Sequence, residues 1–277
     1  MDKKILTVQD VSCFGQCSLT VALPILSAFG IETAILPTAV LSNHTMFKSW
    51  TFADLTEEIP AIDKKWQEAD VKFDCITTGY LGSKKQIGYV KQLIENSLAP
   101  GGFTVIDPVM ADNGKLYVGF DGEFVEEMKN LVAIADVVLP NITEACFLTG
   151  IEYREDDQTP EYIKTLTDGL LALGAKRVVL TGVSLEEGML GVAVSEGGEI
   201  EYRFERYLDK KYHGTGDIFS SVFTGAYFTG ASITDAAHFA AKAVIESIRN
   251  TMGDDSHWYG VKFEKMLPMI TDYVRGR

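Results

Sequence analysis

Residues His213 to Asp217 read His-Gly-Thr-Gly-Asp and come directly before an apolar segment, Ile218 to Phe228. Apolar side chains in this segment recur with the 3.6-residue period of a helix, so we expect a helix to begin here. The first turn of a helix carries unpaired N–H groups and the positive end of the dipole, and glycines let an anion approach them. Asp217 could then take a proton from a hydroxyl that attacks a phosphorus atom held there.

The same residues also fit an ordinary turn whose aspartate caps the helix. Because the stretch alone leaves both interpretations open, the rest of the chain has to decide between them.

Short β-branched strands alternate with helical segments through the first two thirds of the chain. This order predicts an α/β fold with a mostly parallel central sheet flanked by helices. Two alternating segments joined through Gly197-Gly198 predict a small antiparallel hairpin. No linker interrupts the pattern, so we expect one domain over residues 1–277. The predicted strands are 5–9, 33–36, 75–80, 103–106, 137–139, 177–181, 189–195 and 199–205, and the predicted helices include 19–29, 53–69, 83–96, 123–135, 161–173, 216–229, 234–251 and 261–274, with a loop at 37–50.

Several polar residues follow the predicted strands directly. Ligands of parallel sheets bind at the carboxyl ends of the strands, where these side chains would meet. Each also has a structural interpretation, since Asn141 could cap the next helix and Asp107 could cap a turn before Pro108. The residues are Asp10, Tyr80, Asp107, Asn141, Glu144 and Thr181.

The formal net charge of −14 argues against a nucleic-acid or anionic-membrane surface, because both require clustered Lys and Arg. A phosphate ligand would therefore need local charge compensation, which a divalent metal supplies. Four scattered cysteines predict neither a disulfide framework nor a zinc site. The N-terminal residues lack a signal-peptide pattern and no stretch reaches 18 apolar residues, so we expect a soluble cytoplasmic protein.

The motifs in order are Asp107-Pro108-Val109-Met110, then Asn141-x-x-Glu144, then Gly214-Thr215-Gly216-Asp217. With this order the sequence resembles the ribokinase superfamily over essentially its whole length. The segments Ser42-Asn43-His44-Thr45 with Trp50, and Gly79-Tyr80-Leu81-Gly82, resemble the pyridoxal kinase branch. The resemblance implies a ribokinase-like three-layer fold, ATP-dependent phosphorylation of the 5′-hydroxymethyl group of a vitamin B6 vitamer, and a homodimer.

The resemblance also implies roles for single residues. Asp217 would be the base, and the N–H groups of Gly214, Thr215 and Gly216 would bind the transferring phosphoryl group. Mg²⁺ would be bound by Asp107 and Glu144, with Asn141 helping to organise it. ATP would contact Asp107, Asn141, Thr181 and Gly182, and the pyridine pocket would be lined by Asn43, His44, Thr45 and Tyr80.

Elementary chemistry agrees with these roles, because phosphoryl transfer needs mainly positioning, charge neutralisation and one base. Oxygen ligands suit Mg²⁺. No Walker sequence G-x-x-x-x-G-K-[ST] is present, so the commoner ATP-binding loop is excluded.

The first strand departs from the pattern, since Asp10 stands where pyridoxal kinases usually carry Ser, and Ser18-Leu19 replaces their Gly-Asn pair. We expect Asp10 to contact the substrate and to change the choice of vitamer. The alternative is that it points away and caps the loop before the Leu19 helix.

Two other functions stay open. A hydroxymethylpyrimidine or phosphomethylpyrimidine kinase of the same superfamily acts on a similar hydroxymethyl group, but its glycine loop commonly ends in Cys where this chain has Asp217. A non-catalytic vitamer-binding protein on a kinase fold is the third possibility, and an intact Asp217 argues against it.

Overall fold

The computed structural model describes residues 3–210 and 212–276. Its main strands are β1 (Lys4–Ser12), β2 (Glu32–Leu41), β3 (Phe52–Asp54), β4 (Phe73–Thr78), β5 (Leu98–Ile106), β8 (Val137–Val138), β9 (Arg177–Val183), β10 (Met189–Glu196) and β11 (Glu199–Arg206). Within the described residues they form one sheet in the order β11-β10-β9-β8-β5-β4-β1-β2-β3. The strands from β9 to β2 in this order run parallel, whereas β3, β10 and β11 are antiparallel to their neighbours. The predicted mostly parallel sheet with an antiparallel hairpin is confirmed.

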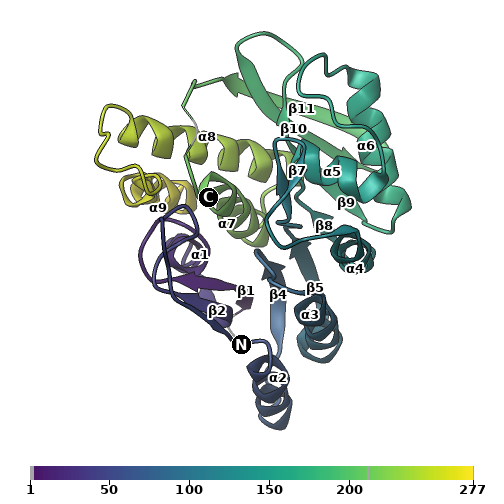
Figure 1. Ribbon diagram of the computed structural model, residues 1–277, viewed down its shortest axis with the longest axis vertical. Helices are drawn as coiled ribbons and strands as arrows, with labels where there is room; N and C mark the ends of the chain where they lie inside the picture. The colour runs from purple at the N-terminus through teal and green to yellow at the C-terminus, as the bar shows by residue number, and fades with distance from the viewer. Residues whose placement is uncertain (1–2, 211, 277) are drawn as a thin grey trace.

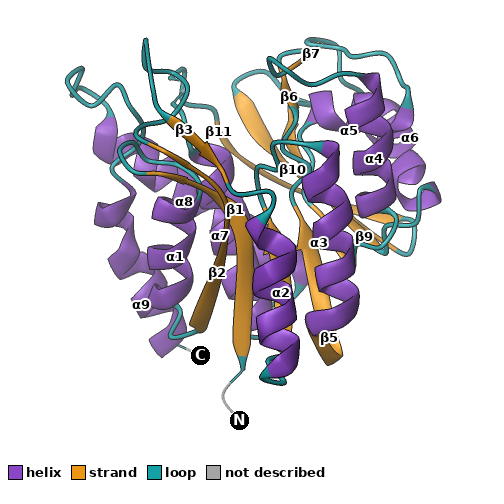
Figure 2. Ribbon diagram, turned by 60° about the horizontal axis from the view of Figure 1, so that its bottom comes forward, coloured by secondary structure: helices purple, strands orange, loops and turns teal. Residues whose placement is uncertain are grey.

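Helices cover both faces of the sheet (Figure 2). One face packs apolar residues against α1 (Leu19–Ala28), α7 (Thr215–Phe228), α8 (Ile233–Thr251) and α9 (Leu267–Arg275). The other face packs against α2 (Glu58–Glu68), α3 (Lys84–Ser97), α4 (Gly122–Val132), α5 (Ile142–Thr149) and α6 (Pro160–Ala172). Each face therefore buries its own apolar core, as a sheet of parallel strands requires.

The strand order reverses between β1 and β4. From β1 the chain crosses to β2 through α1, and it later returns to the other side of β1 as β4, with α2 on the opposite face (Figure 1). Such a reversal opens a crevice at the carboxyl ends of the two strands, where α/β proteins bind ligands. A small ladder of β6 (Ala111–Asp112) and β7 (Lys115–Leu116) follows β5 at the same end of the sheet.

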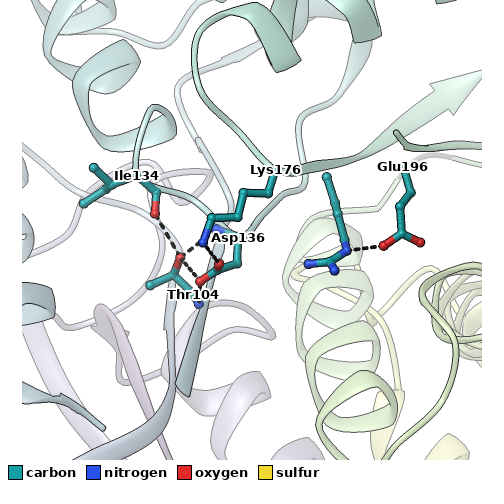
Figure 3. Close-up of polar contacts among 6 residues, drawn as sticks. Thr104, Ile134, Asp136, Lys176 and Glu196 are labelled. Atoms are coloured by element: carbon teal, nitrogen blue, oxygen red, sulfur yellow. Dashed lines mark hydrogen bonds and ion pairs between the residues drawn. The ribbon is translucent and has the colours of Figure 1, made fainter. Parts of the chain in front are cut away.

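The opposite end of the sheet is held by polar contacts around Asp136 (Figure 3). Its carboxylate accepts the N–H of Thr104 at 2.8 Å and the ammonium of Lys176 at 2.7 Å. The Asp136 N–H donates to the Thr104 hydroxyl at 2.9 Å, and Arg177 pairs with Glu196 beside it. These contacts join Thr104 of β5 to the beginnings of β8 and β9, which are the ends of these two strands away from their carboxyl termini.

Some boundaries differ from those predicted. β1 runs on through Asp10 to Ser12, and β2 runs through Pro37 to Leu41, so the predicted loop at 37–50 begins later. β3 pairs with β2 only at Ala39–Leu41, so Pro37 lies where β2 is an edge strand, which tolerates proline.

The helix predicted at 53–69 is wrong in its first residues, which form β3. Asp54 Oδ1 accepts the Thr56 N–H at 2.9 Å, and this local turn ends the strand before α2 begins at Glu58. The helix predicted at 261–274 instead starts as a 3₁₀ turn, η1 (Phe263–Met266), and becomes α-helical at Leu267 with Pro268 in its first turn.

All four cysteines are free thiols. Among the described residues, no helix combines the length and apolar character needed to cross a bilayer.

Candidate active site

The glycine loop lies at the start of α7, as predicted. Gly214 has φ 81°, and a Cβ at this position would lie 1.8 Å from the carbonyl oxygen of Gln16. Only glycine fits both the backbone conformation and this close approach. The glycine loop therefore rests on the β1–α1 loop, and its helical N–H groups are the kind of donors that bind an anion.

Asp217 lies in the first turn of α7 and is partly buried. Its carboxylate accepts the backbone N–H of Ser18, the residue before α1. Burial raises the pKa of Asp217 to about 7, and the nearby charge of Asp10 acts in the same direction. A carboxylate with this pKa is suited to accept a proton near neutral pH.

Asp10 lies near the end of β1 and is only 5% exposed. Its Oδ1 accepts the hydroxyl of Ser18 at 2.6 Å, and its Oδ2 accepts the hydroxyl of Ser12 at 3.1 Å. Burial raises the pKa of Asp10, against the effect of the two serine hydroxyls. The carboxylate therefore reaches the loop before α1, as in the capping alternative, and also lies within charge range of Asp217.

Asp107 and Glu144 come together beside Asp217. Asp107 follows β5, is 8% exposed and accepts the hydroxyl of Ser220 from α7. Burial raises the pKa of Asp107 well above its ordinary value, and the charges of Glu144 and Asp217 raise it further. Asp107 after β5, Glu144 of α5 and Asp217 of α7 thus share one region, and among the described residues no positive charge is found to lower the pKa of Asp107 or Asp217.

Glu144 is engaged by the backbone on both sides. Its Oε2 accepts the Asn141 N–H at 2.9 Å, and its Oε1 accepts the Met110 N–H at 3.1 Å. Asn141 Oδ1 accepts the Glu144 N–H at 2.8 Å, which completes a capping box at the start of α5. Burial nevertheless raises the pKa of Glu144 to about 8. Glu144 therefore ties the segment after β5 to α5, and its ionised form would be favoured by a cation in the site.

The predicted ATP-contacting residues lie together at the next strand ends. Asn141 and Thr181 form a parallel bridge, and the Thr181 N–H donates to the Pro140 carbonyl at 2.9 Å. The Asn141 amide nitrogen donates to the Ala111 carbonyl at 2.9 Å, so one of its N–H groups and its oxygen both bind within the protein. Gly182 has φ 77° and lies within the last residues of β9.

Sequence reasoning missed Tyr117, which follows the β6–β7 ladder. Its N–H donates to the Met110 carbonyl at 2.9 Å. Burial raises the pKa of its phenol, and the charges of Glu144, Asp112, Asp107 and Asp217 add to the effect in that order. The phenol therefore lies close to all three carboxylates. The segment has no hydrophobic period, and only the turn glycines on either side of Tyr117 indicated a loop that folds back.

Tyr80 follows β4, at the carboxyl end of the strand that pairs with β1. Its ring stacks on Phe120 with centroids 5.7 Å apart, and Phe120 stacks on Phe124 at 3.8 Å. Burial raises the pKa of Tyr80, and the charge of Asp10 raises it further. Tyr80 thus presents an aromatic wall close to Asp10, as a flat heteroaromatic ligand would need.

His44 is buried rather than open to the crevice. Its Nδ1 accepts the Met46 N–H at 3.3 Å, so Nε2 carries the proton and donates to the Tyr259 carbonyl at 2.9 Å. Its ring contacts His213, with centroids 4.4 Å apart. His44 therefore joins three loops of the site.

The two neighbours of His44 do not share this position. The Asn43 amide donates to the Ser49 carbonyl at 2.9 Å within its own loop, and Thr45 is exposed. Of the three residues predicted to line the pyridine pocket from this segment, only His44 contacts the residues at the glycine loop.

The described residues contain no group of three His, Cys, Asp or Glu side chains arranged to hold a metal ion. A metal at Asp107 and Glu144 would need further ligands from substrate or water.

A mostly parallel sheet, a helix that begins at a glycine loop with an aspartate, and acidic residues at the strand ends define a ribokinase-like phosphotransferase. The chain belongs to the phosphomethylpyrimidine kinase family, whose model matches residues 27–260.

Individual relatives agree with this family. A pyridoxal kinase of Dictyostelium discoideum is 28% identical over 242 residues, which cover 81% of this chain and 78% of the relative. The crystal structure of pyridoxal kinase from Lactobacillus plantarum is 31% identical with a TM-score of 0.91 and covers 99% of both chains. A Bacteroides thetaiotaomicron protein described as a phosphomethylpyrimidine kinase, crystallised with pyridoxal, is 40% identical with a TM-score of 0.91 and covers 98% of this chain and 96% of its own.

Proposed function

We propose that this chain transfers the γ-phosphoryl group of ATP to the 5′-hydroxymethyl group of a vitamin B6 vitamer: pyridoxal, pyridoxamine or pyridoxine. The observation that carries this proposal is the pairing of Asp217, with a pKa near 7, and the glycine loop at the same helix start. The 40% identical relative that binds pyridoxal supports the vitamer as the acceptor.

In the proposed reaction, Asp217 acts as the base and the glycine loop binds the transferring phosphoryl group. The Asp217 carboxylate removes the proton of the attacking hydroxymethyl group as its oxygen bonds to phosphorus and the bond to the ADP oxygen breaks. The N–H groups of Gly214, Thr215 and Gly216 stabilise the negative charge on the transferring group. Thr181 and Gly182, at the end of β9, lie along the phosphates of ATP.

The residues present fit a Mg²⁺ ion. Asp107 and Glu144 are buried acids with raised pKa values, and the charge of Glu144 raises the pKa of Asp107, so a divalent ion between them would stabilise both carboxylates. Mg²⁺ is commonly held by one or two carboxylates together with substrate phosphates and water, which agrees with the lack of an all-protein cluster. When bound, the ion would neutralise phosphate charge. Asp107 would hold it most directly, because both oxygens of Glu144 already accept backbone N–H groups.

The acceptor ring is proposed to lie between the carboxyl ends of β1 and β4, beside Tyr80 and close to Asp10. The loop that carries Asn43, His44 and Thr45 is proposed to close this space, with His44 holding the loop against His213. The charge of Asp10 favours a vitamer that presents a protonated pyridine nitrogen or an ammonium group. This predicts a preference for pyridoxamine over pyridoxal.

A hydroxymethylpyrimidine is the second candidate acceptor, favoured by the description of the matching family. A coupled ADP-release assay with the three vitamers and hydroxymethylpyrimidine tests the proposal directly. Turnover with a vitamer at a higher kcat/KM than with the pyrimidine supports it, and the reverse order assigns the chain to pyrimidine phosphorylation. Binding of pyridoxal in a thermal shift without any ADP release would identify a non-catalytic binding protein.

We also propose a homodimer. Phe52 on the edge strand β3 is 54% exposed, and Trp50 beside it is 44% exposed, so an apolar edge is available for association. Sedimentation velocity at micromolar concentration would show a single monomeric species if this is wrong.

A further inference from the structure

Ser18 connects two carboxylates of the site through two different groups. Its hydroxyl donates to Asp10 Oδ1 at 2.6 Å, while its backbone N–H donates to the carboxylate of Asp217. Ser18 also has φ 53°, a left-handed conformation that side-chain-bearing residues rarely adopt. A strained residue of this kind persists only where its surroundings hold it.

Asp10 provides such a hold. It lies within β1, is almost fully buried, and its second oxygen is fixed by the Ser12 hydroxyl. A hydrogen bond to a carboxylate is stronger than one between neutral groups. The Ser18 hydroxyl is thus anchored to the central sheet, and the Ser18 N–H is fixed with it.

We propose that Asp10 is a positioning residue, which holds the Ser18 N–H against Asp217 and so fixes the direction of the catalytic carboxylate. This inference rests on the proposed role of Asp217 as the base. The proton transfer needs the carboxylate within hydrogen-bond reach of the hydroxyl, and a displacement of about 1 Å can cost on the order of 100-fold in rate. The proposed effect of Asp10 on vitamer choice is separate, because it acts through charge and not through Ser18.

Two variants separate the hydrogen bond from the charge. Ser18→Ala removes the hydroxyl and keeps the charge of Asp10, whereas Asp10→Asn removes the charge and keeps an oxygen that accepts the hydroxyl. We expect Ser18→Ala to lower kcat on the order of 10-fold with all three vitamers, with little change in KM and an unchanged preference ratio. We expect Asp10→Asn to keep most of kcat and Asp10→Ala to lose it as Ser18→Ala does.

The double variant Asp10→Ala with Ser18→Ala tests whether the two residues act as one unit. We expect its loss in kcat to match that of either single variant, because both remove the same anchor. Ser18→Gly removes the hydroxyl but adopts a positive φ without strain, so it supplies a folded form should Ser18→Ala not fold.

Ser232→Ala is the matched control. Ser232 is also a residue just before a helix, where its hydroxyl accepts the Asp235 N–H at 3.1 Å and donates to the Asp235 carboxylate at 2.8 Å. We expect this variant to lower Tm through the lost cap and to leave kcat unchanged.

Parental kcat in folded Ser18→Ala and Ser18→Gly would overturn the inference, and so would a double variant whose loss is the product of the single losses. Asp217→Asn separates this failure from failure of the proposed function. If Asp217→Asn is inactive while the Ser18 variants turn over normally, only the positioning role is wrong. If Asp217→Asn itself turns over normally, the assignment of the base is wrong.

Discussion

The imidazole rings of His44 and His213 lie in contact, with centroids 4.4 Å apart. His44 belongs to the loop after β2, and His213 comes directly before the glycine loop of α7. The predicted substrate-side motif and the predicted catalytic loop are therefore joined by a packed aromatic pair. Burial, together with the nearby ring of His44, lowers the pKa of His213 to about 4.

This pair predicts acid sensitivity of the fold. A His whose pKa falls on folding stays neutral in the native state, so the unfolded state binds the extra proton and stability is lost as pH falls from about 6.5 to about 4. The difference between these values corresponds to about 3 kcal/mol. Urea unfolding across this range should show a shallower loss for His213→Phe than for the parent.

The raised pKa values of Asp217 and Glu144 change the free energy of unfolding with pH in the opposite direction. Both groups are present in the parent and in His213→Phe, so their effect cancels when the unfolding free energies of the two proteins are subtracted. The two proteins should differ by a constant amount above pH 7.5, where both forms of residue 213 are neutral. If the unfolding free energies of the two proteins fell in parallel from pH 7 to pH 4, the prediction would be wrong.

Asp217→Asn should keep the fold and vitamer binding but lose on the order of 100-fold or more in kcat, because the amide cannot accept the proton. Single-turnover kinetics with saturating ATP would measure the chemical step, and isothermal titration would check that the vitamer still binds. A folded variant with near-parental kcat would refute the assignment of the base.

The pKa of about 7 for Asp217 predicts the pH dependence of the reaction. The base must be ionised, so kcat/KM should fall as pH drops below about 7 and level off above it. The vitamers also ionise in this pH range, so the assay should compare the pH profiles of all three. A fall in kcat/KM that occurs at the same pH with every vitamer belongs to the enzyme. A shared profile that stays flat down to pH 5.5 would show that no group of this pKa acts in catalysis.

Glu144→Ala should weaken Mg²⁺ binding and stability together. The change removes an acid from the proposed metal site and leaves the Met110 and Asn141 N–H groups without their acceptor, at a cost of about 1–3 kcal/mol. Titration of activity with Mg²⁺ should give a higher half-saturation point, with a smaller change in vitamer KM.

Asp121→Ala separates the two effects of this substitution. Asp121 caps α4 by accepting the Phe124 N–H at 2.9 Å, so its loss removes a helix cap outside the site. It should lower Tm without changing the Mg²⁺ titration. An unchanged titration in Glu144→Ala, or activity that survives excess chelator, would remove the metal from the proposal.

The fold was predictable because it depends on local patterns. The β-branched residues at the end of β4 and the apolar period of α7 indicate a strand and a helix without knowledge of their neighbours. Strand ends then placed Asp107 and Glu144 in one region. The same local reasoning put a helix at Ala53, because the Asp54 turn competes with a helix only through a short-range hydrogen bond that periodicity does not reveal.

The contacts between loops were not predictable. Nothing in the sequence near Ser18 indicates that its N–H meets Asp217, and His44 binds a carbonyl 215 residues away. Asn141-x-x-Glu144 has the spacing of a capping box as well as of a metal motif, and only the structure shows that the cap is formed.

The closeness of Gly214 to Gln16 has a consequence for the order in which the protein assembles. The glycine loop of α7 rests on a loop from the beginning of the chain, and Gln16 Nε2 donates to Glu264, 248 residues away. Contacts between such distant segments form late, because the intervening chain must first be ordered. During synthesis the N-terminal strands and helices can pack while the catalytic loop still lacks its support, so on refolding, turnover should return after the far-ultraviolet helix signal has recovered.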